Sequence, residues 1–363
     1  MKFFRFVLVL FVFIDGCVDP ANIEIPAFQY QIVVDGYITT DPGPYEVKLY
    51  RSRPLGSADL DRLIPEKFAK VWIKDDLGAS EQLTETEAGV YLTNINGIRG
   101  VTGRKYHVEI TTVQGKKYES EPDEIKPVGQ VTAINFEFVE GNGDELHEGD
   151  GFRIFADATG VPDVDDLVRL RMVATYKVET FPQLRTKLVE GGRIPDPYPC
   201  SGYVNQENRL VKVSDCTCCT CWVNKYDDIP SITDEQFTTN DIFRGEEVGF
   251  VPASRRTLYD KIHVEIQELS LTPQTYMFWK LVKAQKEGVN NIFQPPSADI
   301  KGNVKALDSS EEVLGIFWAA GINKKAIYLD KTNVPYLVLP IDTLAAPCQF
   351  FSYSSNQKPS FWQ

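Results

Sequence analysis

Alternation of apolar and polar residues with a period of two restricts this chain more than any other feature, because it predicts half-buried strands rather than helices. It is clearest in residues 32–38 and 45–49, which the Pro- and Gly-bearing turn of residues 41–44 separates. Further short strand-like runs, separated by turn residues, follow at residues 69–73, 90–93, 106–112 and 117–120. Several short strands without a helical stretch predict an immunoglobulin-like β-sandwich over residues 28–127.

The remaining residues, 128–363, predict a larger second β-rich domain. Its strand-like runs are residues 131–139, 152–156, 167–180, 262–271, 313–318 and 326–329. One helix interrupts them, with Thr272 as its N-cap, Pro273 in its first turn and Gly288 after its end. We expect Phe278 and Trp279 on the apolar face of this helix to pack in the core. The predicted fold is therefore mainly β, with one helix and a Cys-bearing insertion at about residues 183–240.

The overall charge limits the kind of partner. Among 363 residues, 51 Asp and Glu oppose 38 Lys and Arg, which gives a formal net charge of -13. Such a surface repels a nucleic-acid backbone, so we expect no nucleic-acid partner. The length suggests about two domains.

The amino terminus predicts export and lipid anchoring. A basic start and an apolar run form a signal peptide over residues 1–16, and the run is too short to be a stable membrane anchor. Ile14, Gly16 and Cys17 match a bacterial lipobox, so Cys17 is the predicted lipidation site and residues 17–27 a lipidated tether. The alternative is an ordinary signal peptide cut elsewhere, with Cys17 in a disulfide.

Six further cysteines are candidates for disulfides, because exported chains with an even number of cysteines favour them. They are Cys200, Cys216, Cys218, Cys219, Cys221 and Cys348. Four of them lie within six residues, so Cys200 and Cys348 are natural partners for the cluster. The alternatives are a metal site, since Cys218 and Cys221 have zinc-knuckle spacing, and redox chemistry.

Other candidate sites are sparse. Carboxylates at Asp144, Glu145, Glu148 and Asp150 can ligate Ca²⁺, but they do not match an EF-hand loop, so a solvated turn is the alternative and no metal site is assigned. His107 is expected to face solvent on a strand, and His147 to lie in an exposed loop. No nucleophile elbow, zinc-protease or phosphate-loop motif occurs. We therefore predict no catalytic residue, no cofactor and no enzymatic activity.

Several separate segments resemble one family, the Bacteroidota lipoproteins called domain of unknown function 4249. They are residues 17–20, 32–39, 103–122, 276–279, 291–293, 295–296, 300–303, 313–317 and 359–362. One departure is that family members often carry two cysteines near the carboxyl end, whereas this chain has only Cys348 there.

The resemblance implies an outer-membrane lipoprotein facing the cell exterior, whose gene commonly lies beside one for a TonB-dependent receptor. It supplies no catalytic residue. The leading hypothesis is thus a lipid-anchored accessory subunit that captures an unidentified small ligand for a TonB-dependent outer-membrane receptor. The alternatives are a free-standing extracellular binding module for a glycan or peptide, an accessory of outer-membrane assembly, and an exported hydrolase.

Overall fold

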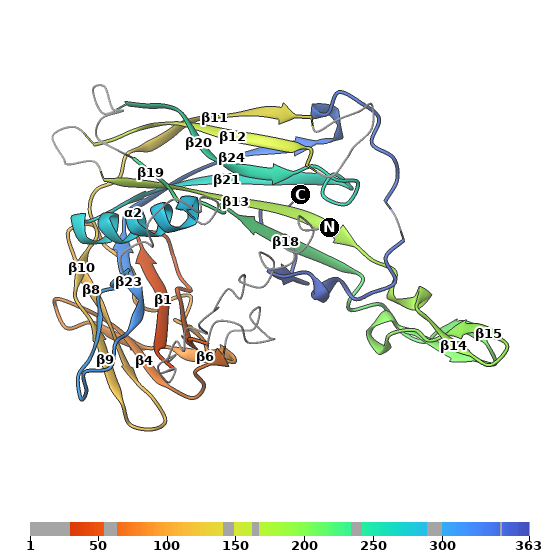
Figure 1. Ribbon diagram of the computed structural model, residues 1–363, viewed down its shortest axis with the longest axis horizontal. Coiled ribbons are helices and arrows are strands. Elements are labelled where there is room, and N and C mark those ends of the chain that lie inside the picture. Colours follow the sequence, from red (N-terminus) through yellow and green to blue (C-terminus); the bar gives the residue numbers. More distant parts are fainter. Residues whose placement is uncertain are drawn as a thin grey trace, which may run out of the picture.

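Two β-sandwiches meet at an angle in the computed structural model, with a helix beside their junction (Figure 1). The structure describes residues 30–53, 64–140, 149–161, 167–233, 242–288, 300–341 and 343–362. The prediction of a mainly β chain with one helix is confirmed for these residues. The immunoglobulin-like detail stays a prediction.

The first sandwich consists of two sheets. One has the strand order β23-β1-β2-β7-β6, with β3 beside β2. Its strands are β1 (Ile32–Thr39), β2 (Glu46–Arg51), β3 (Ile64–Pro65), β6 (Thr84–Glu87), β7 (Val90–Leu92) and β23 (Leu314–Ala320). The other has the order β22-β9-β8-β4-β5, with β10 beside β8. Its strands are β4 (Lys70–Asp75), β5 (Ser80–Gln82), β8 (Lys105–Thr111), β9 (Lys117–Ser120), β10 (Asp123–Glu124) and β22 (Val304–Ala306).

The alternating residues form the core of this first sandwich. Ile32, Val34 and Ile38 are fully buried, and they belong to one cluster with Val71 and Ile73 of the facing sheet. The residues between them on β1, such as Asp35, point to the opposite face of the sheet. The period of two therefore identified the buried face, and it left a polar face turned toward the second sandwich.

A late segment of the chain completes the first sandwich. Residues 304–306 pair with β9 as β22, and residues 314–320 pair with β1 in parallel as β23. The predicted boundary assigned this segment to the domain of residues 128–363, and the structure corrects that assignment. Turn patterns within residues 28–127 could not reveal it, because a parallel pair between β1 and β23 joins residues almost 300 positions apart.

Gly302, Asn303 and Gly315 allow β23 to pack closely against the neighbouring backbone. A Cβ on Gly302 would lie 1.6 Å from the Gly315 carbonyl oxygen, and Gly315 itself has a φ of 85°. The Asn303 side chain donates to the Phe317 carbonyl at 2.6 Å and accepts from the Phe317 N–H at 3.1 Å. These contacts give a physical reason for the glycines and Asn303 in residues 300–303 and 313–317, which suggested the family resemblance.

The second sandwich packs a three-stranded sheet on a larger one. The smaller sheet has the order β11-β12-β20, and the larger has β24-β21-β13-β18-β25, with β19 beside β13. Their strands are β11 (Gln130–Val139), β12 (Gly151–Thr159), β13 (Val168–Glu179), β18 (Thr220–Tyr226), β19 (Ser231–Ile232), β20 (Ile242–Pro252), β21 (Lys261–Ser270), β24 (Ile322–Asp330) and β25 (Ser354–Ser355). Leu170, Met172 and Ile154 lie in the shared core. Arg169 and Arg171 alternate with these core residues, so they face away from it.

The helix α2 (Pro273–Gly288) lies at the junction of the two sandwiches (Figure 1). An apolar cluster fills this junction with Leu269 and Leu271 from the second sandwich and Ile316 and Trp318 from β23. Phe278 and Trp279 pack against the cluster, but both are half-buried rather than interior. We call this junction the seam, and its polar margins carry the sites described below.

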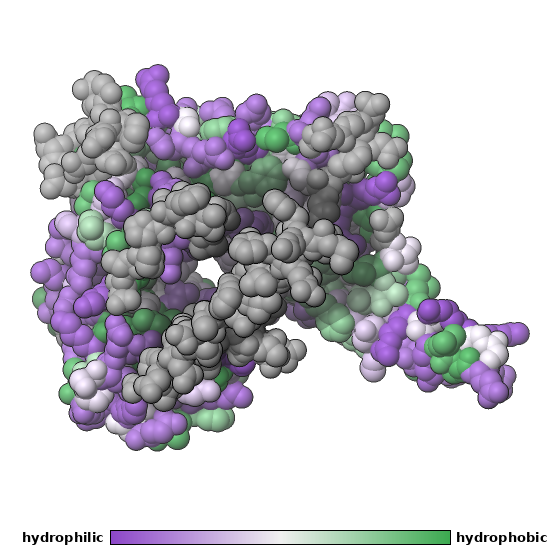
Figure 2. Space-filling model, in the orientation of Figure 1, coloured by the Kyte–Doolittle hydropathy of each residue, from purple (hydrophilic) through white to green (hydrophobic). Residues whose placement is uncertain are grey.

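The Cys-bearing insertion forms an arm that projects from the far end of the second sandwich (Figure 1). Two hairpins build it, from β14 (Thr186–Val189), β15 (Gly192–Pro195), β16 (Tyr203–Gln206) and β17 (Arg209–Lys212). Its disulfides are Cys200–Cys218, Cys216–Cys219 and Cys221–Cys348. The prediction of disulfides is confirmed, and pairing of all six thiols leaves Cys218 and Cys221 no thiolate for zinc. Figure 2 shows a small apolar patch on this arm among mostly hydrophilic residues.

Candidate functional site

A pocket of about 420 Å³ lies between the two sandwiches, beside the seam. Strands β1 and β2 supply one wall through the face of their sheet that points away from the first core. Strands β13, β18 and β21 supply the other wall in the same way. Trp279 of α2 and Trp318 of β23 lie at the end where the walls meet. We call this hollow the inter-sandwich pocket, and its volume is typical of small-molecule sites.

A buried ion pair forms part of the β13 wall. Arg169 Nη2 lies 3.0 Å from Asp227 Oδ2, and the two side chains are 8% and 1% exposed. The guanidinium also stacks on the Trp279 ring, 3.9 Å from its centroid. Burial lowers the pKa of Arg169, and the charge of Asp227 opposes that effect.

This wall is incomplete in its hydrogen bonding. Arg169 Nε, Asp227 Oδ1 and Trp279 Nε1 are buried, and none of them has a hydrogen-bond partner in the part of the chain that the structure describes. A buried polar atom without a partner costs about 1–3 kcal/mol. All three atoms belong to residues that line the pocket, so its wall carries polar groups whose hydrogen bonding the described residues do not complete.

Arg171 lies two residues further along β13, on the same face. Its Nη2 donates to the Tyr37 hydroxyl at 2.8 Å, and its Nε donates to Gln267 Oε1 at 2.8 Å. Burial would lower the pKa of Arg171, but Tyr37 and the charge of Asp227 outweigh it, so this pKa is raised. Among the described residues no carboxylate pairs with Arg171, so its positive charge is held in place by neutral groups.

Asp35 is the matching unpaired charge on the opposite wall. Its exposed side chain has no hydrogen bond or ion pair with a described residue. Lys48 is its cross-strand neighbour, but Lys48 Nζ contacts Glu46 at 2.6 Å. Desolvation by the surrounding protein raises the pKa of Asp35. The charges of Lys48, Arg169 and Arg171 partly oppose this effect.

Aromatic rings line the space between these charges. Tyr226 and Tyr353 meet edge to face with centroids 5.3 Å apart, and both side chains are exposed. Tyr37 contacts Trp318 at 5.3 Å, and Trp279 contacts Trp318 at 5.8 Å. The pocket therefore offers flat apolar faces beside fixed charges, which can hold a ligand with both kinds of group.

A second polar cluster at the seam is complete. The buried carboxylate of Asp123 accepts from Thr272 Oγ1 at 2.6 Å, Thr275 Oγ1 at 2.9 Å and the Ala319 N–H at 2.9 Å. Burial raises the pKa of Asp123, and these hydrogen bonds oppose that effect. The cluster joins β10, the start of α2 and β23, so it fixes the two sandwiches to each other. Within the described residues, the polar side chains of this cluster all hydrogen-bond to one another or to the backbone.

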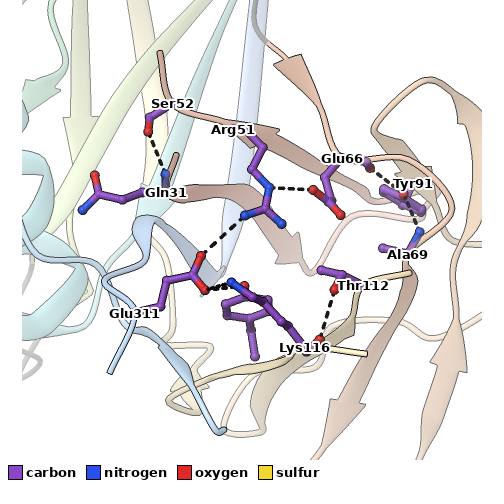
Figure 3. Close-up of polar contacts among 10 residues, drawn as sticks. Gln31, Arg51, Ser52, Glu66, Ala69, Tyr91, Thr112, Lys116 and Glu311 are labelled. Carbon is purple, nitrogen blue, oxygen red and sulfur yellow. Dashed lines mark hydrogen bonds and ion pairs between the residues drawn. The ribbon is translucent and has the colours of Figure 1, made fainter. Parts of the chain in front are cut away.

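A third polar cluster closes the end of the first sandwich (Figure 3). Arg51 Nε donates to Glu66 at 2.7 Å, and Arg51 Nη1 lies 3.5 Å from Glu311. Lys116 and the Tyr118 hydroxyl also contact Glu311. Burial and the charge of Glu311 raise the pKa of Tyr118 to about 12. Each acidic group here has a basic partner, so the cluster anchors the segment that leads into β23.

Most of the predicted calcium ligands lie outside the described residues. These are Asp144, Glu145 and Glu148, together with His147; Cys17 of the lipobox also lies outside them. Asp150 is described and buried, and its carboxylate accepts from the Tyr336 hydroxyl at 2.6 Å. This contact gives Asp150 a structural role in the second sandwich.

His107 lies on the outer face of its sheet, as expected, but it is half-buried and has acidic neighbours. Its Nε2 lies 3.6 Å from Glu109 and 3.8 Å from Glu119. The three groups can each place a ligand atom within 4.8 Å of the others, which is close enough to share an ion. Lys74 already neutralises Glu109 at 2.6 Å, so we assign no site there.

Comparison with protein families gives one match. The family model described as domain of unknown function, DUF4249, matches residues 18–326, which is most of the chain. The chain belongs to this family. A search of curated proteins found no relative that matches it. Among the described residues of this DUF4249 chain, no helix is long and apolar enough to cross a membrane.

The sequence did contain a signal for the pocket. Residues 168–172 alternate Val, Leu and Met with Arg169 and Arg171, which places two guanidinium groups on one face of a strand whose other face is core. Asp35 similarly interrupts an apolar strand. Charges repeated on one face of a buried strand are uncommon unless they pair or bind something. What the sequence could not reveal is that β1 and β13 face each other.

Proposed function

We propose that this protein is a lipid-anchored binding protein that captures a small ligand in the inter-sandwich pocket and passes it to a TonB-dependent receptor in the outer membrane. One observation carries the capture role. The pocket contains two opposite charges, Asp35 and Arg171, that have no ionic partner in the described part of the chain, and they lie beside aromatic rings. Lipid anchoring rests on the lipobox at Cys17, and the receptor on the family resemblance.

The projecting arm supports docking on another protein. Leu188 in its β14–β15 hairpin is 76% exposed, and Leu184 and Val213 are 45% and 60% exposed. Exposed apolar side chains on a projecting element are typical of interaction sites. The disulfides Cys200–Cys218 and Cys216–Cys219 stiffen the base of the arm, which reduces the entropy lost when it docks.

The capture role is tested with the acylated full-length protein purified from its native outer membrane in mild detergent. Native mass spectrometry should show a bound small molecule that organic extraction releases. Trp279→Ala should lower the bound fraction, whereas Trp72→Ala, a change on a strand of the first sandwich outside the pocket, should not. Protein that carries no small molecule from any growth condition would contradict capture.

The docking role is tested by crosslinking in the native membrane and affinity purification. We expect one TonB-dependent receptor in near-equal amount, and its loss in Cys17→Ala. Leu188→Lys should also reduce recovery, whereas Leu77→Lys should not, although Leu77 is 77% exposed on the first sandwich. Recovery of the protein alone would favour a free-standing binding module.

A further inference from the structure

We propose that the inter-sandwich pocket binds a zwitterion, an amino acid or a short peptide, whose carboxylate pairs with Arg171 and whose ammonium group pairs with Asp35. This inference rests on the proposed function, because it names the ligand class of the same pocket. It is argued from the balance of charge in the lining, the positions of the two unpaired charges, and the aromatic surface between the walls.

The charges of the lining cancel. Six charged side chains face the pocket: Lys48, Arg169, Arg171, Asp35, Glu46 and Asp227. Three are basic and three are acidic, so the formal sum is zero. A pocket built for an anion or a cation has an excess of the opposite charge. This lining instead suits a ligand whose own net charge is zero.

Four of these six charged side chains form ion pairs with one another. Lys48 pairs with Glu46 at 2.6 Å, and Arg169 pairs with Asp227 at 3.0 Å. Arg171 and Asp35 remain, with opposite signs and without an ionic partner among the described residues. A neutral sugar would leave both charges without an ionic partner, whereas a zwitterion can form a charge-assisted hydrogen bond with each of them.

The charges of Arg171 and Asp35 lie on opposite walls of the same pocket. Arg171 reaches across from β13 and donates to Tyr37 of β1 at 2.8 Å. Asp35 lies two residues from Tyr37 on the same face of β1, and such residues are about 7 Å apart. The charges of Lys48, Arg169 and Arg171 all act on the Asp35 carboxyl, and that of Lys48 acts most strongly. A ligand that carries both an ammonium group and a carboxylate can therefore contact both walls.

Aromatic side chains provide for the rest of the ligand. Tyr226 and Tyr353 present exposed rings at the pocket, and the indole of Trp279 is half-buried in its wall. These faces favour an apolar or aromatic side chain on the ligand. A smaller hollow of about 170 Å³ shares Tyr37 and Arg171 with the pocket. Space is therefore present on a second side of Arg171, the proposed carboxylate-binding residue.

Isothermal titration calorimetry on the acylated full-length protein in detergent tests this assignment. The probes are L-phenylalanine and phenylalanylphenylalanine, each also in N-acetylated and C-amidated form. We expect at least one free zwitterion to bind roughly 10- to 100-fold more tightly than its two blocked forms, since each block removes one charge-assisted hydrogen bond. The stronger of the two free probes distinguishes an amino acid from a peptide.

Variants then assign each charge to one end of the ligand. Asp35→Asn should abolish the preference for the free over the N-acetylated form. Arg171→Gln should abolish the preference over the amide, and Arg171→Lys should restore part of it. Arg153→Gln and Asp228→Asn, which change exposed groups outside the lining, should leave both preferences intact. Thermal unfolding confirms that each variant is folded.

The results that would overturn the proposal differ from those that would overturn ligand capture. Equal binding of free and blocked probes, or preferences unchanged in both Asp35→Asn and Arg171→Gln, would refute the zwitterion. A co-purified molecule that is purely anionic or an uncharged sugar would also refute it, but capture would stand. If neither these probes nor any native small molecule binds, both proposals fail.

Discussion

Two polar clusters border the same helix at the same seam, and they differ in completeness. At the start of α2, the carboxylate of Asp123 accepts three hydrogen bonds, all from groups of the protein itself. Two turns further along, Trp279 faces a pocket in which three buried polar atoms have no hydrogen-bond partner, and two charges no ionic partner, among the described residues. Both clusters arise because polar residues lie where two sandwiches meet.

The difference separates structure from function within one interface. A complete cluster stabilises the folded state, because each buried polar group replaces its hydrogen bonds to water with hydrogen bonds to protein groups. An incomplete cluster reduces stability, and proteins retain such groups where a ligand or a reaction uses them. We therefore expect changes at Asp123 to act on stability, and changes at Arg171 and Asp35 to act on binding.

The largest effect on stability should come from breaking the buried pair in the pocket wall. Arg169→Met leaves the Asp227 carboxylate, 1% exposed, without its partner, and we expect the free energy of unfolding to fall by about 3–5 kcal/mol. Replacing both members, as Arg169→Met with Asp227→Leu, should cost less than the single change. Urea unfolding measures both, and a double variant less stable than the single one would contradict this account.

Removing the centre of the complete cluster should have the next largest effect. Asp123→Ala removes the shared acceptor of two threonine hydroxyls and one N–H of the seam, so the free energy of unfolding should fall by about 2–4 kcal/mol. Glu124→Ala on the same strand is the matched control, because its partly exposed pair with Lys126 contributes little. The ligand affinity of folded Asp123→Ala should equal that of the native protein. A tenfold loss of affinity would show that the two clusters are not independent.

The cluster of Figure 3 should respond more weakly. Glu311→Gln removes one charge that Arg51 and Lys116 share, and we expect a loss of about 1 kcal/mol, because Lys116 is half-exposed and salt screens the interaction. The exposed neighbour Glu312 provides the control, as Glu312→Gln. Denaturation measures the difference in free energy of unfolding between the native protein and Glu311→Gln. We expect this difference to be smaller in high salt than in low salt. An unchanged difference would argue against a charge effect.

The smallest effect should follow acidification, through a site away from the seam. His263 is buried between Phe361, stacked at 4.0 Å, and Tyr328, and burial lowers its pKa. The unfolded chain therefore takes up the proton more readily, so stability should fall as pH drops below about 6.5, the pKa of free histidine. His263→Phe should reduce this part of the pH dependence, as thermal unfolding between pH 7 and 5 can show. A dependence unaltered by His263→Phe would exclude this residue as its source.

The sequence predicted local structure well and long-range contacts poorly, for a physical reason. The alternating residues of β1, β4 and β8 identified their buried faces, since side-chain direction follows from position along a strand. The helix that begins after Thr272 was equally clear from its cap. The pairing of β23 with β1 could not be predicted from residues 28–127, because the pairing partner of a strand depends on the whole chain.

The candidate site divides in the same way. Cysteine count and spacing predicted disulfides, but the partner of Cys221 is 127 positions away and no spacing rule names it. The two arginines of β13 were visible as charges on one face of a strand. That these arginines line a pocket could not be inferred without knowing that Asp35 and Tyr37 lie opposite them. This placement depends on the angle between the two sandwiches.

The most direct test of the central claim is a crystal structure of the protein with the tighter of the two free probes bound. The account predicts one molecule in the inter-sandwich pocket, with its carboxylate about 2.7–2.9 Å from the Arg171 guanidinium and its ammonium group at a similar distance from Asp35. A probe bound elsewhere, or one in the pocket that touches neither charge, would contradict the claim.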